Sequence, residues 1–149
     1  MKRFHFQLER VLDYKNQILD SLVGEEAAIM ARIREQERVI AGLEQEYITH
    51  CRTMNESQKN GTDAMSIRIY ENYLDTLGVR IQNARKELLL LKQEEEVKRK
   101  QLLEAKKDST SLVKLKERKY SEYQSTCLKQ TEKEIEEFIS NNRRTLIRT

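Results

Sequence analysis

Apolar residues recur at alternating spacings of four and three along most of this chain, and this repeat constrains its fold more than any other feature. From Leu8 to Met54 the repeat has fourteen positions, of which ten are apolar. A mean spacing of 3.5 residues favours a left-handed coiled-coil seam over a helix that packs on a globular core. Because the pattern is sustained over many heptads, it predicts one long helix over about residues 4–56.

The same repeat returns after a short interruption. It occupies eight successive positions from Ile67 to Leu91, all of them apolar, and thins further along the chain. Beyond about Ser109 its phase shifts, which indicates a stutter where the supercoil locally unwinds. We therefore expect a second helix over about residues 66–140 and a flexible tail over residues 141–149. The shifted stripe consists of Gln124, Leu128, Thr131, Ile135 and Phe138.

The interruption carries the strongest turn signal in the sequence. Asn60 and Gly61 both tolerate a positive φ, and Thr62 or Asp63 can then cap a new helix. We expect a turn over about residues 57–65, where the chain reverses. The predicted fold is all-α: a long two-helix antiparallel coiled coil (a helical hairpin), forming one domain over residues 1–149 with an overhanging C-terminal helix.

The reversal predicts a register in which apolar residues meet across the two helices. Met54 then faces Ile67, Tyr47 faces Leu74, Ile40 faces Ile81 and Ile33 faces Leu88. The first helix ends opposite about Glu117, so that everything from Arg118 onward overhangs.

An apolar stripe continues along the overhang, although a lone helix gains little stability from helix propensity. We interpret this stripe as a surface for a partner chain. Phe4 and Phe6 precede the first repeat, and they either plug the end of the hairpin and cover part of the stripe or form a docking knob. The stripe consists of Tyr120, Tyr123, Cys127, Leu128, Ile135 and Phe138.

The composition excludes several classes of function. The chain is 36% charged with no Pro, and its net charge of +3 is small, so most charges belong to solvated helix faces. Apart from Arg143, Arg144 and Arg148 there is no concentrated basic stretch, and we expect no nucleic-acid binding. No segment is apolar enough for a transmembrane helix or a secretory signal, and two isolated cysteines indicate the cytosol.

No catalytic or ligand-binding motif is present. The sequence has no phosphate-binding Gly-rich loop and no nucleophile elbow, and its two His and two Cys residues lack zinc-site spacing. We therefore expect no enzymatic activity, no cofactor and no metal.

Four stretches of the chain resemble the flagellar export protein FliJ family, which is related to the stalk proteins of type III secretion systems. They lie at Phe4–Asp13, at Glu25–Ala28, at Asn60-Gly61 with Ile69–Leu74, and at Leu115–Tyr120. The C-terminal residues from Asn141 depart from the acidic ending of such proteins. The resemblance thus spans nearly the whole chain.

This resemblance implies a non-enzymatic stalk of the flagellar protein export apparatus, which acts in flagellum assembly and motility. The implied partners are the export ATPase ring, the cytoplasmic domain of the export gate's membrane protein, and export chaperones. The implied location is the cytoplasm at the inner face of the cell membrane, with the isolated protein a monomer. Gate contacts carry over to Ile40, Leu43, Tyr47, Tyr73 and Leu77, and ring contacts to Phe4, Phe6, Tyr120, Tyr123, Leu128, Ile135 and Phe138.

Three alternatives remain open at this point. The stripes could drive a homodimeric coiled-coil scaffold without a hairpin, or the chain could be an injectisome stalk. A nucleic-acid accessory acting through Arg143, Arg144 and Arg148 is the third.

Overall fold

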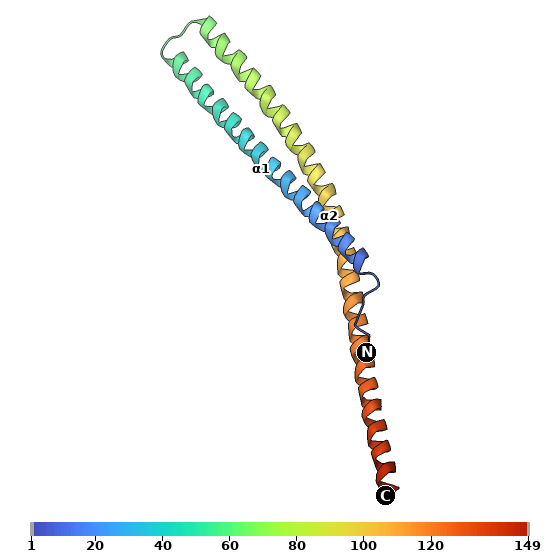
Figure 1. Cartoon of the computed structure of the whole chain (residues 1–149). Helices are drawn as coiled ribbons and strands as arrows, with labels where there is room; N and C mark the ends of the chain where they lie inside the picture. The colour runs from blue at the N-terminus through green and yellow to red at the C-terminus, as the bar shows by residue number, and fades with distance from the viewer. Residues whose placement is uncertain (1, 149) are drawn as a thin grey trace. The chain divides into compact units, whose positions relative to one another are not determined.

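Two long α-helices form the chain, which a computed structural model describes over residues 2–148 (Figure 1). Helix α1 spans Glu9–Lys59 and helix α2 spans Ala64–Ile147. The two helices pack against each other in opposite directions, which confirms the predicted all-α helical hairpin.

Both helices differ from the predicted ranges at their outer ends. Residues 2–6 have no regular secondary structure and helix α1 begins at Glu9, so the expected helical start near Phe4 is wrong. Helix α2 continues to Ile147, seven residues beyond the predicted end at residue 140. No Gly or Pro occurs after Gly78, so nothing in the sequence forces α2 to end earlier.

The turn between the helices uses the residues that the sequence indicates. Gly61 has a φ of 78° and is followed by the cap residue Asp63, whose Oδ1 accepts a hydrogen bond from the Ser66 N–H at 3.1 Å. Hydrogen bonding to Ser66 lowers the pKa of Asp63, because these bonds favour its charged form. The prediction that Thr62 or Asp63 caps the second helix is therefore confirmed for Asp63.

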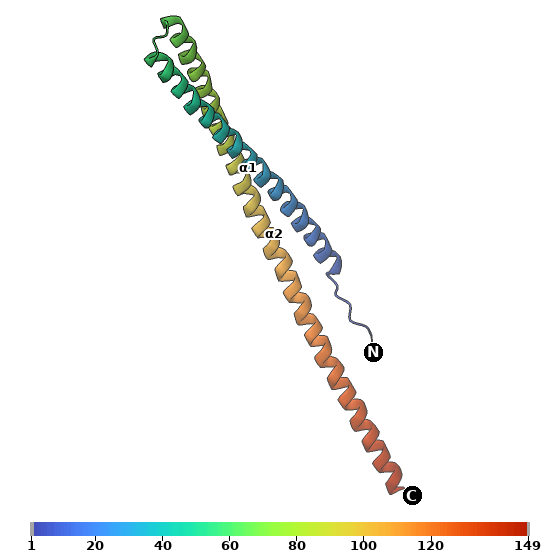
Figure 2. The same cartoon turned by 90° about the vertical axis from the view of Figure 1, so that its left-hand side faces the viewer.

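The chain divides into two compact units. We call Asp20–Leu103 the hairpin unit, and Met1–Leu19 with Glu104–Thr149 the terminal unit. Within the hairpin unit, α1 and α2 lie side by side on either side of the turn (Figures 1 and 2). The buried apolar residues of this unit are all seam positions: Ile29, Ile33 and Ile40 from α1, and Leu74, Leu77, Ile81, Ala84 and Leu91 from α2.

The hairpin register agrees with the predicted pairing. Leu88 packs against a cluster of Ile29, Ile33 and Leu91, as the expected contact between Ile33 and Leu88 requires. The seam residue Gln36 donates from its Nε2 to the backbone carbonyl of Ala84 at 3.0 Å. This hydrogen bond can form in only one alignment of the two helices. It therefore helps to fix their register.

Candidate partner-binding sites

In the terminal unit, three aromatic rings join the N-terminal segment to α2. The ring of Phe4 packs edge-on against Tyr120, with centroids 5.1 Å apart, and lies 5.5 Å from the ring of Tyr123. The Tyr123 hydroxyl donates a hydrogen bond to the Lys2 carbonyl at 2.8 Å. The extended segment is therefore held both by apolar contact and by its backbone. We call Phe4, Tyr120 and Tyr123 the aromatic cluster.

The contacts of the aromatic cluster show that the predicted overhang is partly covered by the N-terminal segment. Arg118 was expected to begin an uncovered stretch of α2, yet the N-terminal segment reaches Tyr123. The reason is geometric: an extended chain advances more than twice as far per residue as a helix, so a few residues before Glu9 cover a long stretch of α2. Of the two alternatives for Phe4 and Phe6, the structure favours partial cover of the stripe.

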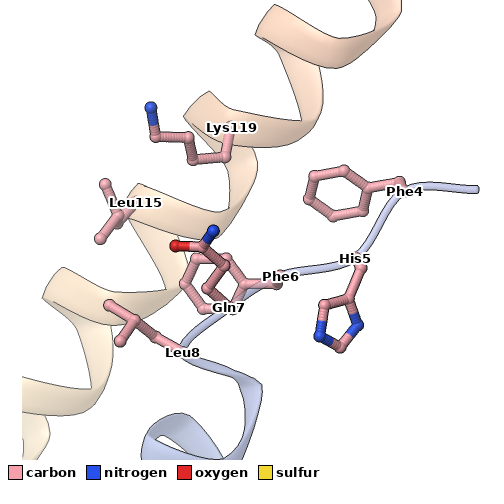
Figure 3. Close-up of a pocket in the computed structure, with 7 residues that line it drawn as sticks. All are labelled: Phe4, His5, Phe6, Gln7, Leu8, Leu115 and Lys119. Carbon is pink, nitrogen blue, oxygen red and sulfur yellow. The ribbon is translucent and has the colours of Figure 1, made fainter. Parts of the chain in front are cut away.

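Phe6 anchors the same segment two residues further along. Its side chain is 6% exposed, while His5 points away from α2 and Phe4 lies toward it (Figure 3). A pocket of about 290 Å³ opens beside Phe6 and has both apolar and polar walls. It is lined by Phe4, His5, Phe6, Gln7, Leu8, Leu115 and Lys119.

Polar contacts at the start of α1 hold this helix on α2 within the terminal unit. Glu9 accepts a hydrogen bond from Lys116 at 2.8 Å. Asn16 accepts one at 2.6 Å from the hydroxyl of Ser109, which is buried. A buried hydroxyl needs such a partner, so Asn16 and Ser109 form a polar layer that specifies the register locally.

Tyr123 also contacts one of the two cysteines. Several effects raise the pKa of Tyr123. The largest is its hydrogen bond with the Cys127 thiol, and the second is the partial loss of water around its hydroxyl. Cys127 and Cys51 are both free thiols.

Beyond Cys127 the predicted stripe is open to solvent. All residues from Leu128 to Arg148 are exposed. Three of the residues proposed for ring contact lie here, namely Leu128, Ile135 and Phe138. The structure thus separates them from Phe4, Phe6, Tyr120 and Tyr123, which it brings together.

In the hairpin unit, the five residues proposed for gate contact have different surroundings. Leu77 is 0% exposed and Ile40 is also buried, so both hold the helices together. Leu43 and Tyr73 are half-buried, and Tyr47 is exposed. The accessible part of this set is therefore Leu43, Tyr47 and Tyr73.

Tyr73 belongs to a small polar cluster that sequence reasoning missed. Its hydroxyl donates to the Glu46 carboxylate, and its ring lies 4.4 Å from the His50 ring, centroid to centroid. His50 is tied to its own helix through a 3.0 Å contact between Nδ1 and the Glu46 carbonyl. The pKa of Tyr73 is raised, mainly by the hydrogen bond with Glu46 and next by the partial burial of its hydroxyl. The spacing of four between Glu46 and His50, which places both on one helix face, was the available signal.

A groove of about 490 Å³ lies in the hairpin unit. Gly78 lines it, and a Cβ placed on Gly78 would meet nothing within 4 Å, so the missing side chain keeps the groove open. Ile48 also lines the groove and is 46% exposed. The other lining residues are Glu44, Tyr47, Ile81, Gln82 and Arg85.

Over the described residues 2–148, no group of three or more His, Cys, Asp or Glu side chains is placed to hold a metal ion. The same residues contain no helix with the length and apolar character needed to span a bilayer.

No curated protein and no solved structure matches the chain. A family model described as flagellar FliJ protein matches residues 4–144, which is nearly the whole chain. The chain therefore belongs to the flagellar FliJ protein family, whose members are non-catalytic components of the flagellar protein export apparatus.

Proposed function

We propose that this protein is a non-enzymatic stalk that inserts into the export ATPase ring through its terminal unit. The proposal depends on one observation in the terminal unit. The aromatic cluster packs on α2, and an exposed apolar stripe follows it further along that helix. Exposed aromatic and aliphatic side chains of this kind are the usual anchors of protein interfaces. The family match supports a flagellar rather than an injectisome partner.

The hairpin unit supplies the second contact in this proposal. Tyr47 and Ile48 line the groove at Gly78, and the half-buried Tyr73 adds aromatic surface elsewhere on the hairpin unit. We assign this surface to the cytoplasmic domain of the export gate's membrane protein, with export chaperones as further partners. The protein then acts in the cytoplasm and reaches the inner face of the membrane through its partners.

ATPase turnover and ring formation test the proposal. The full-length protein should increase both when it is added to the cognate export ATPase. Tyr120→Asp should weaken the effect because it places a charge within the aromatic cluster, whereas Tyr14→Asp changes a tyrosine that is 61% exposed on α1 and serves as the matched control. If the unaltered protein changes neither turnover nor ring formation, the proposed stalk function is wrong.

A further inference from the structure

The turn between α1 and α2 contains a dipeptide, Asn60-Gly61, whose chemistry the proposed function does not use. Both residues are exposed, and both lie outside the helices, since α1 ends at Lys59 and α2 begins at Ala64. Asn60 is the one asparagine of the sequence that precedes a glycine. The other asparagines all lie within α1 or α2, and they are Asn16, Asn55, Asn72, Asn83, Asn141 and Asn142.

The side-chain amide of Asn60 and the backbone nitrogen of Gly61 are both weakly held. Among the described residues 2–148, the Asn60 side chain has no hydrogen-bond partner. The Gly61 N–H donates a long hydrogen bond, 3.4 Å from nitrogen to the Gln58 carbonyl oxygen. Gly61 has no Cβ to shield its nitrogen, and a Cβ built there would meet nothing within 4 Å. The nitrogen is therefore open to approach by the neighbouring side chain.

We propose that Asn60 is a site of spontaneous deamidation, a reaction to which asparagine is prone. The Gly61 backbone nitrogen loses its proton to solvent base and attacks the side-chain carbon Cγ of Asn60. A new C–N bond forms, the bond from Cγ to the side-chain nitrogen breaks, and that nitrogen leaves as ammonia after taking a proton from water. A five-membered succinimide ring remains. Water then opens the ring at either carbonyl, which leaves aspartate or isoaspartate at position 60.

The helices protect the other asparagines from this reaction. Asn72 and Asn83 are exposed on α2, but the backbone N–H that follows each of them belongs to the helical hydrogen-bond ladder. The residues that follow, Tyr73 and Ala84, also carry a Cβ beside the attacking nitrogen. Attack requires the helix to open locally, which costs free energy that the turn does not have to supply. Asn72 and Asn83 are thus controls within the same chain.

Isoaspartate changes the path of the chain through the turn. Its main chain runs through the former side chain, so that one additional carbon atom enters the backbone before Gly61. Gly61 has a φ of 78° and lies two residues before the cap residue Asp63, whose Oδ1 accepts the hydrogen bond from the Ser66 N–H. The longer backbone displaces this reversal relative to the two helix ends that it joins. We therefore expect the isoaspartate form of the hairpin unit to be less stable.

Both products also add one negative charge, which lowers the formal net charge of +3 by one. This charge lies beside Lys59 at the C-terminus of α1 and near the N-terminus of α2. Negative charge is unfavourable at the first position and favourable at the second, because of the helix dipoles. The two effects oppose each other, so the longer backbone of isoaspartate should dominate the change in stability.

Incubation of the folded full-length protein at mildly alkaline pH tests the proposal, because base removes the Gly61 amide proton. Cleavage after glutamate gives a peptide of residues 57–71, with Asn60, and a peptide of residues 72–87, with Asn72 and Asn83. Mass spectrometry measures conversion of amide to acid, and methylation by an isoaspartyl methyltransferase detects isoaspartate. An unincubated sample digested in parallel corrects for conversion during digestion. We expect conversion at Asn60 to be at least about tenfold faster than at Asn72 or Asn83.

Two substitutions separate the reaction from its consequence. Asn60→Gln keeps an uncharged amide but requires a larger ring, so it should abolish conversion at this position. Asn60→Asp, measured without incubation, adds the charge without the additional backbone atom and should melt at the temperature of the unaltered protein. The isoaspartate form, separated by ion exchange, should melt at a lower temperature.

Two results would overturn the inference. Conversion at Asn60 that is no faster than at Asn72 and Asn83 would show that the turn does not promote the reaction. An isoaspartate form that melts together with Asn60→Asp would show that the longer backbone leaves the turn intact. Neither measurement involves the export ATPase, so the proposed stalk function is judged separately.

Discussion

The ring of Phe4 packs edge-on against the ring of Tyr120, with 5.1 Å between their centroids, although the two residues lie far apart in the sequence. This contact fixes an extended segment on α2 before α1 has begun. It also makes the N-terminal residues part of the surface that we assign to the ATPase ring. Edge-to-face aromatic pairs contribute about 0.5–1.5 kcal/mol beyond the area that they bury.

Phe4→Ala should therefore release the N-terminal segment without unfolding α2. We expect faster proteolysis within the first eight residues and a decrease in the free energy of unfolding of about 1 kcal/mol. Limited proteolysis followed by mass spectrometry measures the release. Tyr14→Ala removes an exposed tyrosine from the same unit and should leave the cleavage rate unchanged. Equal cleavage rates in all three proteins would show that Phe4 does not hold the segment.

Truncation of Leu77 should destabilise the hairpin unit more than truncation of an exposed leucine. Leu77 is 0% exposed, and Leu→Ala at such a site costs about 2–5 kcal/mol, with the low end expected in a two-helix core. Leu90 is 64% exposed on the same helix, and Leu90→Ala should change stability by about 0.5 kcal/mol or less. Urea unfolding followed by circular dichroism gives both values. Similar losses for both variants would contradict the buried position of Leu77.

Two glycines should respond to substitution with opposite signs. Gly61→Val should destabilise the turn by about 1 kcal/mol or more, because Gly61 has a φ of 78° that a β-branched residue does not adopt without strain. Gly42 lies within α1, and a Cβ there meets nothing within 4 Å. Gly42→Ala should stabilise the helix by up to about 1 kcal/mol. Thermal melts of both variants test the pair, and a stabilising Gly61→Val would disprove the strained turn.

The hydrogen bond between Tyr73 and Glu46 predicts a pH dependence. The pKa of Tyr73 is raised above its usual value of 10.0, so the neutral phenol is favoured in the folded state. Its contribution to stability is fully present below pH 10 and is lost as the pH rises through the raised pKa. Stability measured between neutral pH and high pH should therefore fall more for the unaltered protein than for Tyr73→Phe. Parallel pH curves for the two proteins would rule out this contribution.

The sequence predicted the hairpin well because its signals are local or periodic. The heptad repeat placed Ile33 opposite Leu88, and Asn60-Gly61 with Asp63 located the turn and its cap. The extended path of Phe4 and Phe6 was not predicted, because two alternating residues are too few to establish a period. Their contact with Tyr120 depends on where α1 begins along α2. The ring contact between His50 and Tyr73 depends on side-chain rotamers, which no spacing in the sequence specifies.

The groove at Gly78 offers a direct test of the proposed gate contact. Gly78→Leu should fill the groove, because a Cβ added at Gly78 has no neighbouring atom within 4 Å and leucine favours the helix. We expect weaker binding to the cytoplasmic domain of the gate protein by roughly tenfold, with helix stability kept or raised. Val79→Leu, at the neighbouring exposed position, is the matched control and should bind normally. Calorimetry with the purified gate domain measures both, and equal affinities for the two variants would place the gate contact elsewhere on the hairpin unit.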